Sequence, residues 1–457
     1  MSTTGGGIRR LLVANRGEIA VRILRAAKAL NIETVLACSE ADQDSLAARQ
    51  ADAVVVIGPA RADRSYLNID ALLKALHDSG ADAVHPGYGF LAESAAFADA
   101  VEEAGAIFVG PSGDIIRRMG DKAEARRTAL AAGVPVVPGS AGEPADIEAA
   151  IAAAETVGYP LLIKASAGGG GRGIRLARDA AELAREFPLA QREAQAAFGN
   201  GALYLERFIE HARHIEVQIL GDGQRAVHLF ERECSLQRRR QKLLEEAPSP
   251  VLSAAQRETL CASAVRLAES LGYRGAGTLE YLFDEARGEF FFIEMNTRIQ
   301  VEHPVSEMVT GIDLVQAMLC IAGGEPLRLR QEDIHLLGAA IELRLNAEDP
   351  ARNFFPSPGT VEQLAWPRGA GIRVDSHLYA GYRVPPYYDS LLAKLIAHGA
   401  DRTEALARAR QALDELRLTG MATTASLHRR LLDEPWVIEA RFDTGTLEHW
   451  LAEEIPA

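Results

Sequence analysis

Short apolar runs alternate with amphipathic stretches along the N-terminal part of the chain, from about residue 10 to residue 110. Period-two runs predict strands, and apolar residues spaced three or four apart predict helices. The predicted strands are Arg10–Ala14, Thr34–Cys38, Ala53–Ile57, Ala83–His85 and Ile107–Val109. The predicted helices are Glu18–Leu30, Ile69–Ser79 and Ser94–Ala104. This order predicts a doubly wound βα domain built on a parallel sheet.

The pattern changes after a cluster of proline and glycine residues between Pro135 and Pro144. An alanine-rich helix is predicted over Ala145–Val157, where Gly158 and Pro160 end it. The segment that follows is rich in predicted strands: Leu161–Ala165, Gly173–Leu176, Ala202–Glu206, His214–Leu220, Ala226–Glu231, Gly277–Phe283 and Glu289–Glu294. The last two strands are joined by D-E-A-R-G, a hairpin turn.

A third region follows the break G-G-E-P, which comes after a predicted helix at Ile312–Gly323. It mixes strands such as Ala339–Asn346 with a helix near Thr403–Leu418. We therefore predict an N-terminal domain at residues 1–115, a central domain at 116–330 and a C-terminal α+β domain at 331–457. Two or three domains also suit 457 residues, because single cores rarely exceed about 250 to 300 residues.

The charge balance limits the partners that the chain is expected to bind. With 63 acidic and 49 basic residues the net charge is −14, which argues against nucleic acid or an anionic membrane as a partner. The cysteines at 38, 234, 261 and 320 form no CxxC pair, so neither a disulfide framework nor a zinc site is indicated. No signal-peptide pattern and no long apolar run are present. A cytoplasmic protein is expected.

The turn after the first strand reads A-N-R-G-E-I-A and lacks the G-x-G-x-x-G of dinucleotide-binding folds. Nicotinamide binding is therefore disfavoured. A polar strand-to-helix turn is a sufficient explanation of this segment.

The stretch F-F-F-I-E-M-N-T-R-I-Q-V-E-H, residues 290–303, is the densest group of chemistry-bearing side chains. Glu294 and Asn296 lie two residues apart at a strand end, and Glu280 on the neighbouring strand can complete a magnesium site. Arg298 suggests a clamp for a small anion, and Glu302 suggests a general base. The alternative is a set of solvated strand-end charges; the number of such residues favours the site.

The segment K-A-S-A-G-G-G-G-R-G begins with Lys164 at a predicted strand end and continues into four consecutive glycines. Backbone amides without Cβ crowding can wrap phosphate oxygens, and the lysine adds a point charge. It is not a Walker A loop, because G-K-[ST] is absent. A flexible hinge is the alternative, and the flanking basic residues favour phosphate.

A basic stretch, E-R-E-C-S-L-Q-R-R-R-Q-K, spans residues 231–242. It lacks the interleaved aromatic residues of nucleic-acid sites, so anion binding is favoured. Cys234 within it could be a nucleophile, but no triad pattern accompanies it, and a small buried residue is the preferred interpretation. Lys122, in M-G-D-K, is a weaker candidate because Asp121 as a helix N-cap explains the motif.

Taken together, these segments resemble the biotin carboxylase family. The motifs are A-N-R-G-E-I-A, H-P-G-Y-G-F-L-A-E, M-G-D-K, K-A-S-A-G-G-G-G-R-G, G-A-G-T-L-E, E-M-N-T-R-I-Q-V-E-H and N-A-E-D-P. They run in order from about Ile8 to beyond Leu418. The resemblance implies an ATP-grasp fold of three parts, whose central domain carries a mobile lid at about residues 136–209.

The resemblance also implies site residues. The phosphates of ATP would be bound by Lys122, Lys164, Gly170 and Gly171, and the rest of the nucleotide by Glu206, Arg207, Ile209, His214 and Gln237. The divalent metal, Mg²⁺ or Mn²⁺, would be held by Glu280, Glu294 and Asn296. Bicarbonate would be bound by Lys242, Arg298, Gln300 and Val301. Glu302 would deprotonate bicarbonate, Arg344 would stabilise the biotin enolate, and Tyr88 of H-P-G-Y would be a further cofactor-binding residue.

Two positions depart from the family pattern. Arg240 stands where the family usually has histidine or asparagine, and Ala167 replaces the first glycine of a five-glycine loop. The added charge of Arg240 is expected to alter nucleotide affinity or turnover. Ala167 is expected to be tolerated unless its φ must be positive.

The implied reaction forms carboxyphosphate from ATP and bicarbonate, and then carboxylates biotin. The sequence carries no E-A-M-K-M motif, so biotin is expected on a separate biotin carboxyl carrier protein, with separate carboxyltransferase subunits. Acetyl-CoA is the default final acceptor; propionyl-CoA, methylcrotonyl-CoA and pyruvate are alternatives. A homodimer is implied by the resemblance alone. The rival functions are an ATP-grasp ligase that joins an acyl phosphate to an amine, and a nucleotide-binding regulatory subunit without catalysis.

Overall fold

The computed structural model describes residues 7–166 and 174–454. It divides into two compact units. Unit 1 comprises Met1–Val134, Arg213–Tyr281 and Glu294–Ala457, and unit 2 comprises Pro135–Ala212 and Leu282–Ile293. Ala167, Gly170 and Gly171, three positions singled out in the sequence, lie outside the described residues.

Unit 1 begins with a parallel sheet of order β3-β2-β1-β4-β5. Its strands are β1 (Arg10–Val13), β2 (Glu33–Cys38), β3 (Ala53–Val56), β4 (Ala83–His85) and β5 (Ile107–Phe108). The accompanying helices are α1 (Gly17–Ala29), α2 (Leu46–Gln50), α3 (Ile69–Ser79), α4 (Ala95–Glu103), α5 (Gly113–Gly120) and α6 (Lys122–Ala131). The predicted doubly wound α/β fold is confirmed.

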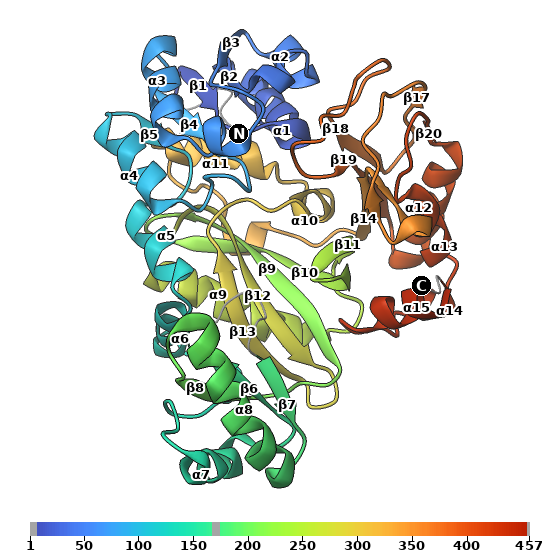
Figure 1. Ribbon diagram of the computed structural model, residues 1–457. Coiled ribbons are helices and arrows are strands. Elements are labelled where there is room, and N and C mark those ends of the chain that lie inside the picture. Colours follow the sequence, from blue (N-terminus) through green and yellow to red (C-terminus); the bar gives the residue numbers. More distant parts are fainter. Residues whose placement is uncertain (1–6, 167–173, 455–457) are drawn as a thin grey trace. The chain divides into compact units, whose positions relative to one another are not determined.

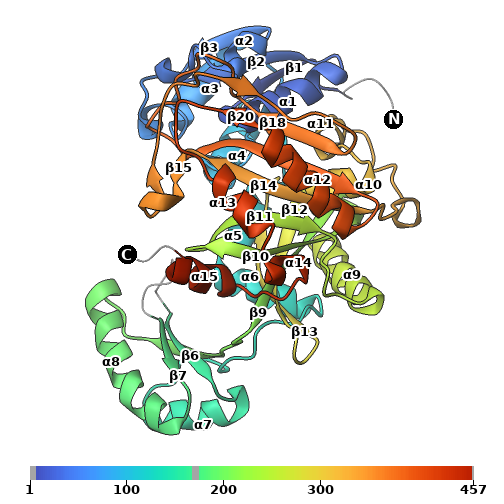
Figure 2. The same cartoon turned by 90° about the vertical axis from the view of Figure 1, so that its right-hand side faces the viewer.

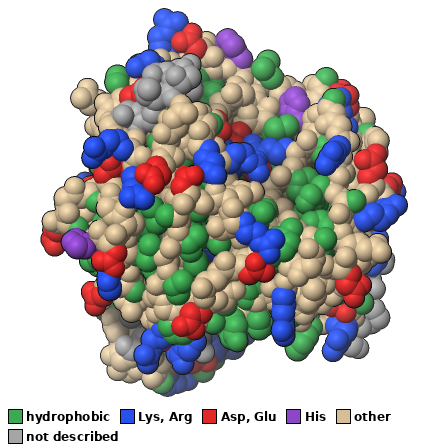
Figure 3. All heavy atoms as spheres, turned by 90° about the horizontal axis from the view of Figure 1, so that it is seen from above, with side chains coloured by type: hydrophobic (Ala, Val, Ile, Leu, Met, Phe, Trp, Pro, Cys, Tyr) green, Lys and Arg blue, Asp and Glu red, His purple; other side chains and the backbone are tan. Residues whose placement is uncertain are grey.

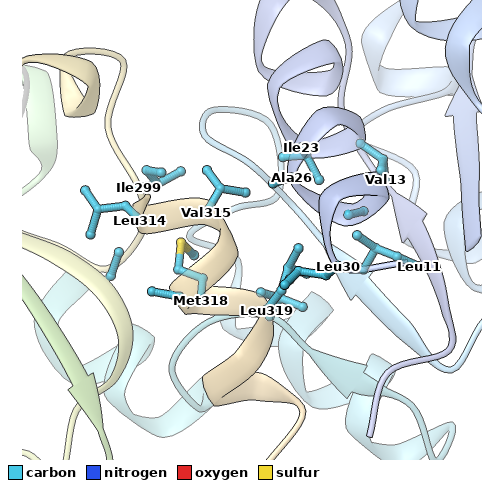
Figure 4. Packing of buried hydrophobic residues seen from close by; sticks show 14 of the residues in the cluster. Leu11, Val13, Ile23, Ala26, Leu30, Ile299, Leu314, Val315, Met318 and Leu319 are labelled. Atoms are coloured by element: carbon cyan, nitrogen blue, oxygen red, sulfur yellow. The ribbon is translucent and has the colours of Figure 1, made fainter. Parts of the chain in front are cut away.

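The central strand β1 is buried on both faces, as strands of parallel sheets covered by helices usually are. Leu11 and Val13 face one apolar cluster and Leu12 faces another. The first cluster continues into α11 (Leu314–Ala322), so that α1 and α11 meet through their apolar faces, as Figure 4 shows. A segment some three hundred residues along the chain therefore closes the N-terminal core.

The second sheet of unit 1 has eight strands in the order β13-β12-β9-β10-β11-β14-β19-β18, seen in Figure 1. The strands are β9 (Ala212–Asp222), β10 (Ala226–Arg238), β11 (Gln241–Ala247), β12 (Arg274–Asp284), β13 (Glu289–Asn296), β14 (Ala339–Asn346), β18 (Ile372–Ser376) and β19 (Leu391–Gly399). The ends of β12 and β13 that meet at the hairpin belong to unit 2. Two small sheets pair β15 (Glu348–Asp349) with β16 (Phe355–Pro356) and β17 (Leu364–Ala365) with β20 (Arg417–Leu418).

Helices cover both faces of the C-terminal part of this sheet. Figure 2 shows α12 and α13 beside β14, and both helices share one apolar cluster with β14 and β19. On the other face, α10 packs Val305 and Val309 against Ala340 and Ile396. The remaining helices are α9 (Ala254–Ser270), α10 (His303–Thr310), α12 (Arg402–Glu415), α13 (Ala425–Leu431), α14 (Pro435–Ile438) and α15 (Thr446–Glu454). Residues 302 and 303 are thereby held against β14 and β19.

Unit 2 is a small antiparallel sheet backed by helices. Its strand order is β7-β6-β8, with β6 (Leu161–Ala165), β7 (Ile174–Ala177) and β8 (Leu203–Arg207). Helices α7 (Ile147–Val157) and α8 (Ala180–Phe198) bury their apolar residues against it. The alternate buried positions of β6 confirm that one face of this sheet is packed and the other is not.

No single helix among the described residues has the length and apolar composition needed to cross a membrane. The pair α10 and α11 passes that test together, but the two helices are bent by 96° at the break between them. Most residues of both helices are buried inside unit 1. Core helices of globular domains often pass a hydropathy test of this kind.

Charged groups are distributed in two ways. Lysine, arginine and acidic side chains are interspersed on the face drawn in Figure 3. A second set is buried in unit 1 and includes Glu18, Glu216, Arg232, Glu245, Glu302, Glu342 and Lys394. Burying a charge is costly unless it is paired and hydrogen-bonded. The second set therefore marks a candidate functional region of unit 1.

The contact between α1 and α11 predicts the effect of a cavity. Leu319 is 0% exposed in this cluster, so Leu319→Ala is expected to lower the free energy of unfolding by about 2–5 kcal/mol. Leu337→Ala, at a side chain 60% exposed, is the control and should change little. Urea unfolding of both variants measures the difference, and equal values would contradict this account of the core.

Candidate active site

The ammonium group of Lys242 lies between three buried carboxylates. Nζ is 2.6 Å from Glu216 Oε2, 3.0 Å from Glu280 Oε1 and 2.6 Å from Glu302 Oε1. Burial alone would lower the pKa of Lys242, but the three carboxylates raise it well above its usual range. Burial alone would raise the pKa of Glu302, but Lys242 and then Arg344 hold it well below its usual range. Both groups are therefore charged at neutral pH.

The sheet brings these side chains together. β12, β9, β10 and β11 are neighbours, Glu216 of β9 pairs with Arg232 of β10, and Gln237 of β10 pairs with Lys242 of β11. Residues opposite each other in an antiparallel pair point to the same face. The side chains of four strands thus converge although they are distant in sequence.

The guanidinium of Arg232 balances the charge of Glu216 in this cluster. Its side chain is 0% exposed, and Nε donates to Glu216 Oε1 at 2.5 Å. Its other nitrogens donate to Gln218, Thr278, Gln300 and Ser306 at 2.7–3.1 Å. A buried guanidinium with this many acceptors fixes several strands relative to one another.

Arg344 of β14 approaches Glu302 from the other side. Its Nη2 lies 3.0 Å from Glu302 Oε2, and its Nε donates to Glu245 Oε1 at 2.6 Å. Glu302 is therefore held between Lys242 on one oxygen and Arg344 on the other. A carboxylate fixed by two cations cannot rotate freely, which is what a proton acceptor of defined direction requires.

Glu280, Glu294 and Asn296 form a group of oxygen donors. Asn296 Nδ2 donates to Glu280 Oε1 at 2.9 Å. Burial and then the charge of Glu280 raise the pKa of Glu294, whereas Lys122 lowers it. A divalent cation between the two carboxylates would relieve their repulsion, and oxygen donors suit Mg²⁺ or Mn²⁺. The residues predicted as metal ligands therefore fit such an ion.

Side chains of a neighbouring group of possible metal ligands are already paired with other side chains of the protein. Ligand atoms of His214, Glu216 and Glu280 all lie within 4.8 Å of one another. The Lys242 ammonium contacts both carboxylates, and His214 Nε2 is 2.9 Å from Glu280 Oε2. Burial would lower the pKa of His214, but Glu280 raises it. Lys242 therefore occupies the place that a metal shared by Glu216 and Glu280 would take.

The loop from 298 to 301 lies beside this group. Arg298 Nε donates to Glu93 Oε2 at 2.8 Å and its Nη2 to Asn296 Oδ1 at 2.9 Å. Gln300 Nε2 donates to Glu280 Oε1 at 2.9 Å. The carbonyl of Val301 accepts from Lys394 Nζ at 2.8 Å. Arg298 and Gln300 therefore lie beside Asn296 and Glu280.

Three further predicted residues lie in unit 1. Half-buried Tyr88 donates its hydroxyl to Glu18, and Arg344 acts on it electrostatically. Gln237 pairs with Lys242. Arg240 is exposed at the tip of the β10–β11 hairpin, where its φ is 65°.

The predicted nucleotide residues of unit 2 lie on β8 and its neighbours. The ammonium of Lys164 forms an ion pair with Glu206. Arg207 Nη2 lies 3.1 Å from Glu289 Oε2, and its guanidinium lies over the ring of Phe291. Ile209 is buried in a small apolar cluster with Val137 and Ala212, among others.

Several residues of the cluster were missed in the sequence. Glu216, Arg232 and Glu245 are 0% exposed and contact the predicted residues, and Glu93 binds Arg298. A signal existed in R-H-I-E-V-Q-I, residues 213–219, where polar side chains occupy alternate positions of an apolar strand. Cys234 is 0% exposed and burial raises its pKa well above the usual value, so the interpretation as a small buried residue is confirmed.

Family models match almost the whole chain. The biotin carboxylase N-terminal domain matches residues 7–116, the ATP binding domain of the carbamoyl-phosphate synthase L chain matches 121–330, and the biotin carboxylase C-terminal domain matches 342–449. A biotin carboxylase of Pseudomonas aeruginosa is 53% identical over 451 residues, which cover 98% of this chain and 99% of that protein.

Solved structures of biotin carboxylase domains are also similar to this chain. The biotin carboxylase domain of a thermophilic 2-oxoglutarate carboxylase, bound to bicarbonate, has a TM-score of 0.93 and 45% identity over 97% of this chain and 98% of that chain. A dimer of the corresponding Hydrogenobacter thermophilus domain, in complex with MgADP, ADP and bicarbonate, has a TM-score of 0.87 and 47% identity over 97% and 98% of the two chains.

Arg232 offers a test of the buried network. Arg232→Leu should lower the free energy of unfolding by about 3–5 kcal/mol, because it leaves buried acceptors and part of the charge of Glu216 without a partner. The control is Arg330→Leu, at a side chain 61% exposed and paired with Asp333, where no measurable change is expected. Chemical denaturation compares them, and a silent Arg232→Leu would show that the network contributes nothing.

Proposed function

Because this chain belongs to the biotin carboxylase family of ATP-grasp ligases, we propose that it uses ATP and bicarbonate to carboxylate biotin on a separate carrier protein. One observation carries the assignment of chemistry to residues: Glu302 is held between Lys242 and Arg344. A carboxylate so placed can accept a proton from an anion that the same cations attract.

In this proposal Glu280, Glu294 and Asn296 hold Mg²⁺ or Mn²⁺. The bound metal would supply electrostatic stabilisation of the ATP phosphates. What the chain itself contributes is the orientation of these oxygens: Asn296 is fixed between Glu280 and Arg298.

Bicarbonate would lie against Lys242, Arg298, Gln300 and the backbone of Val301. Glu302 takes its proton, and the bicarbonate oxygen attacks the γ-phosphorus of ATP while the bond to the β-phosphate oxygen breaks, which gives ADP and carboxyphosphate. The cationic side chains stabilise the charge that develops on the transferred group.

Carboxyphosphate then breaks down to CO2 and phosphate. The phosphate accepts the N1′ proton of biotin, and the resulting ureido enolate attacks CO2. Arg344 would stabilise the negative oxygen of that enolate, because its guanidinium reaches the same space as Glu302. Tyr88, which contacts Glu18 beside this space, would line the biotin end.

The nucleotide contacts are also proposals. They comprise Lys122, Lys164, Gly170, Gly171, Glu206, Arg207, Ile209, His214, Gln237 and Arg240. The ion pair with Glu206 holds the ammonium of Lys164 near the end of β6. A phosphate oxygen could bind the same ammonium. The domain limits 1–115, 116–330 and 331–457, with a lid at about 136–209, remain predictions in the same sense.

The partners follow from the reaction. Biotin requires a biotin carboxyl carrier protein, and carboxyltransferase subunits must use the product; we propose acetyl-CoA as the final acceptor. A similar domain serves a 2-oxoglutarate carboxylase, so co-purification of the carboxyltransferase is the measurement that identifies the acceptor. A homodimer is proposed because a similar domain forms a dimer. A cytoplasmic location remains a prediction.

The first prediction from this proposal concerns the base. Purified wild-type protein should hydrolyse ATP only when bicarbonate and free biotin are both present, and Glu302→Gln should lower that rate by about 10²- to 10⁴-fold because the proton acceptor is lost. Arg344→Ser should also abolish biotin-dependent ATP turnover, because the biotin enolate loses its cationic partner. ADP release measures both, with circular dichroism as the control for folding. A Glu302→Gln enzyme with near-wild-type turnover would refute the assignment.

The second prediction concerns the departure at Arg240. If its charge attracts the ATP phosphates, Arg240→His should raise the KM for ATP by about fivefold, the scale of an exposed ionic contact. Arg239→His is a matched control, because Arg239 is also exposed at the hairpin tip and also has a positive φ. Equal kinetics for the two variants would show that the departure is neutral.

A further inference from the structure

The pairing of β11 with β14 brings two buried glutamates together beside the candidate active site. Glu245 lies directly opposite Glu342 in the antiparallel ladder, and both residues are 0% exposed. Opposed residues have Cβ atoms about 4.5–5.5 Å apart and point to the same face. Two carboxyl groups at this separation in a dry interior do not both ionise readily.

Within the part of the chain that the structure describes, no cation donates a hydrogen bond to Glu342. Arg344 pairs with Glu245 and Glu302, and Lys394, directly opposite Arg344 in the β14–β19 ladder, lies 3.1 Å from Glu18. The other charged groups that act on these carboxyl groups are Lys242, Arg232 and Asp375. A carboxyl group buried without a hydrogen-bonded cation is costly to ionise, so Glu342 is the candidate for the neutral form.

The hydrogen bonds indicate which carboxyl group it is. Glu302 is bound by two cations, Glu245 Oε1 accepts from Arg344, and Glu18 accepts from a tyrosine hydroxyl. Among the described residues, neither carboxyl oxygen of Glu342 has a hydrogen-bond partner, and Oε2 of Glu245 and Oε2 of Glu18 have none either. Glu18 is paired with Lys394, whereas Glu245 lies directly opposite Glu342 in the ladder, so Oε2 of Glu245 is the acceptor that the strand pairing offers to a proton on Glu342.

We propose that Glu342 is protonated in the folded enzyme and donates a hydrogen bond to Oε2 of Glu245, which stays ionised and orients Arg344 towards Glu302. Glu245 and Glu342 are then positioning residues that act through Arg344. The assignment rests on the proposed function, in which Arg344 stabilises the biotin enolate. Burial, only partly offset by Lys394, raises the pKa of Glu342 well above its usual value. Burial also raises the pKa of Glu245, but Arg344 limits that rise to about 7, so Glu342 is the first of the two to hold a proton.

The catalytic test compares two replacements of Glu342. In Glu342→Gln the amide N–H can donate to Glu245 as the carboxylic acid does, so kcat for biotin-dependent ATP hydrolysis should stay within about twofold of wild type. Glu342→Leu has no donor and leaves Glu245 Oε2 unsatisfied. Its kcat should fall at least about tenfold with an unchanged KM for ATP. Glu245→Gln removes the carboxylate charge that pairs with Arg344 and should lower kcat at least as much.

The second measurement does not need catalysis. An unfolded Glu342 ionises above its usual pKa of 4.5, whereas the folded one keeps its proton, so wild-type stability should fall as pH rises. Relative to Glu342→Gln, the unfolding equilibrium constant of the wild type should rise about tenfold per pH unit between about pH 6 and pH 8. Exposed Glu332→Gln, the control, should show no such divergence.

The outcomes distinguish a failure of the protonated pair from a failure of the proposed function. A Gln variant that loses as much turnover as the Leu variant, or a stability difference that does not change with pH, overturns the protonated pair. A wild-type protein without biotin-dependent ATP hydrolysis overturns the proposed function instead, and the pH dependence of stability then still decides whether Glu342 carries the proton.

Discussion

The candidate site depends on the buried ammonium of Lys242. Glu216, Glu280 and Glu302 are at most 8% exposed, and Lys242 contacts all three, whereas Arg232, His214 and Arg344 each contact one of them. Without Lys242 the three carboxylates would repel one another in a nearly dry interior. The strand pairing that places β11 beside β10 is therefore a condition of the chemistry as well as of the fold.

Much of the fold follows from local sequence pattern. The strand at Ala83–His85 and the helix at Ile69–Ser79 have the predicted limits, because period and capping residues, such as Asn68 at the helix N-terminus, coincide there. Long strands were underestimated: β10 extends to Arg238, although its polar run E-R-E-C-S-L-Q-R resembles a loop. Its polar side chains are stabilised by partners on other strands, which periodicity cannot show.

The same limit applies to the site. The density of Glu294, Arg298 and Glu302 within a short segment is visible in the sequence, and the resemblance to a family supplied Lys242 and Arg344. Glu245 was not found, because its role exists only through the register of β11 with β14. Register depends on long-range pairing that no window of one strand contains. Sequence identifies residues that carry chemistry more readily than those that neutralise or orient them.

The electrostatics of Glu302 constrain how a base could work here. Lys242 and Arg344 keep its pKa well below the usual value, so in this state it is a weak base, although a general base is most effective with a pKa near the working pH. An anion that drew Lys242 towards itself would weaken the contact with Glu302 and raise the basicity of that carboxylate. Since the arriving bicarbonate is such an anion, substrate binding and activation of the base would be one event: the proton acceptor would gain strength only when its substrate is present.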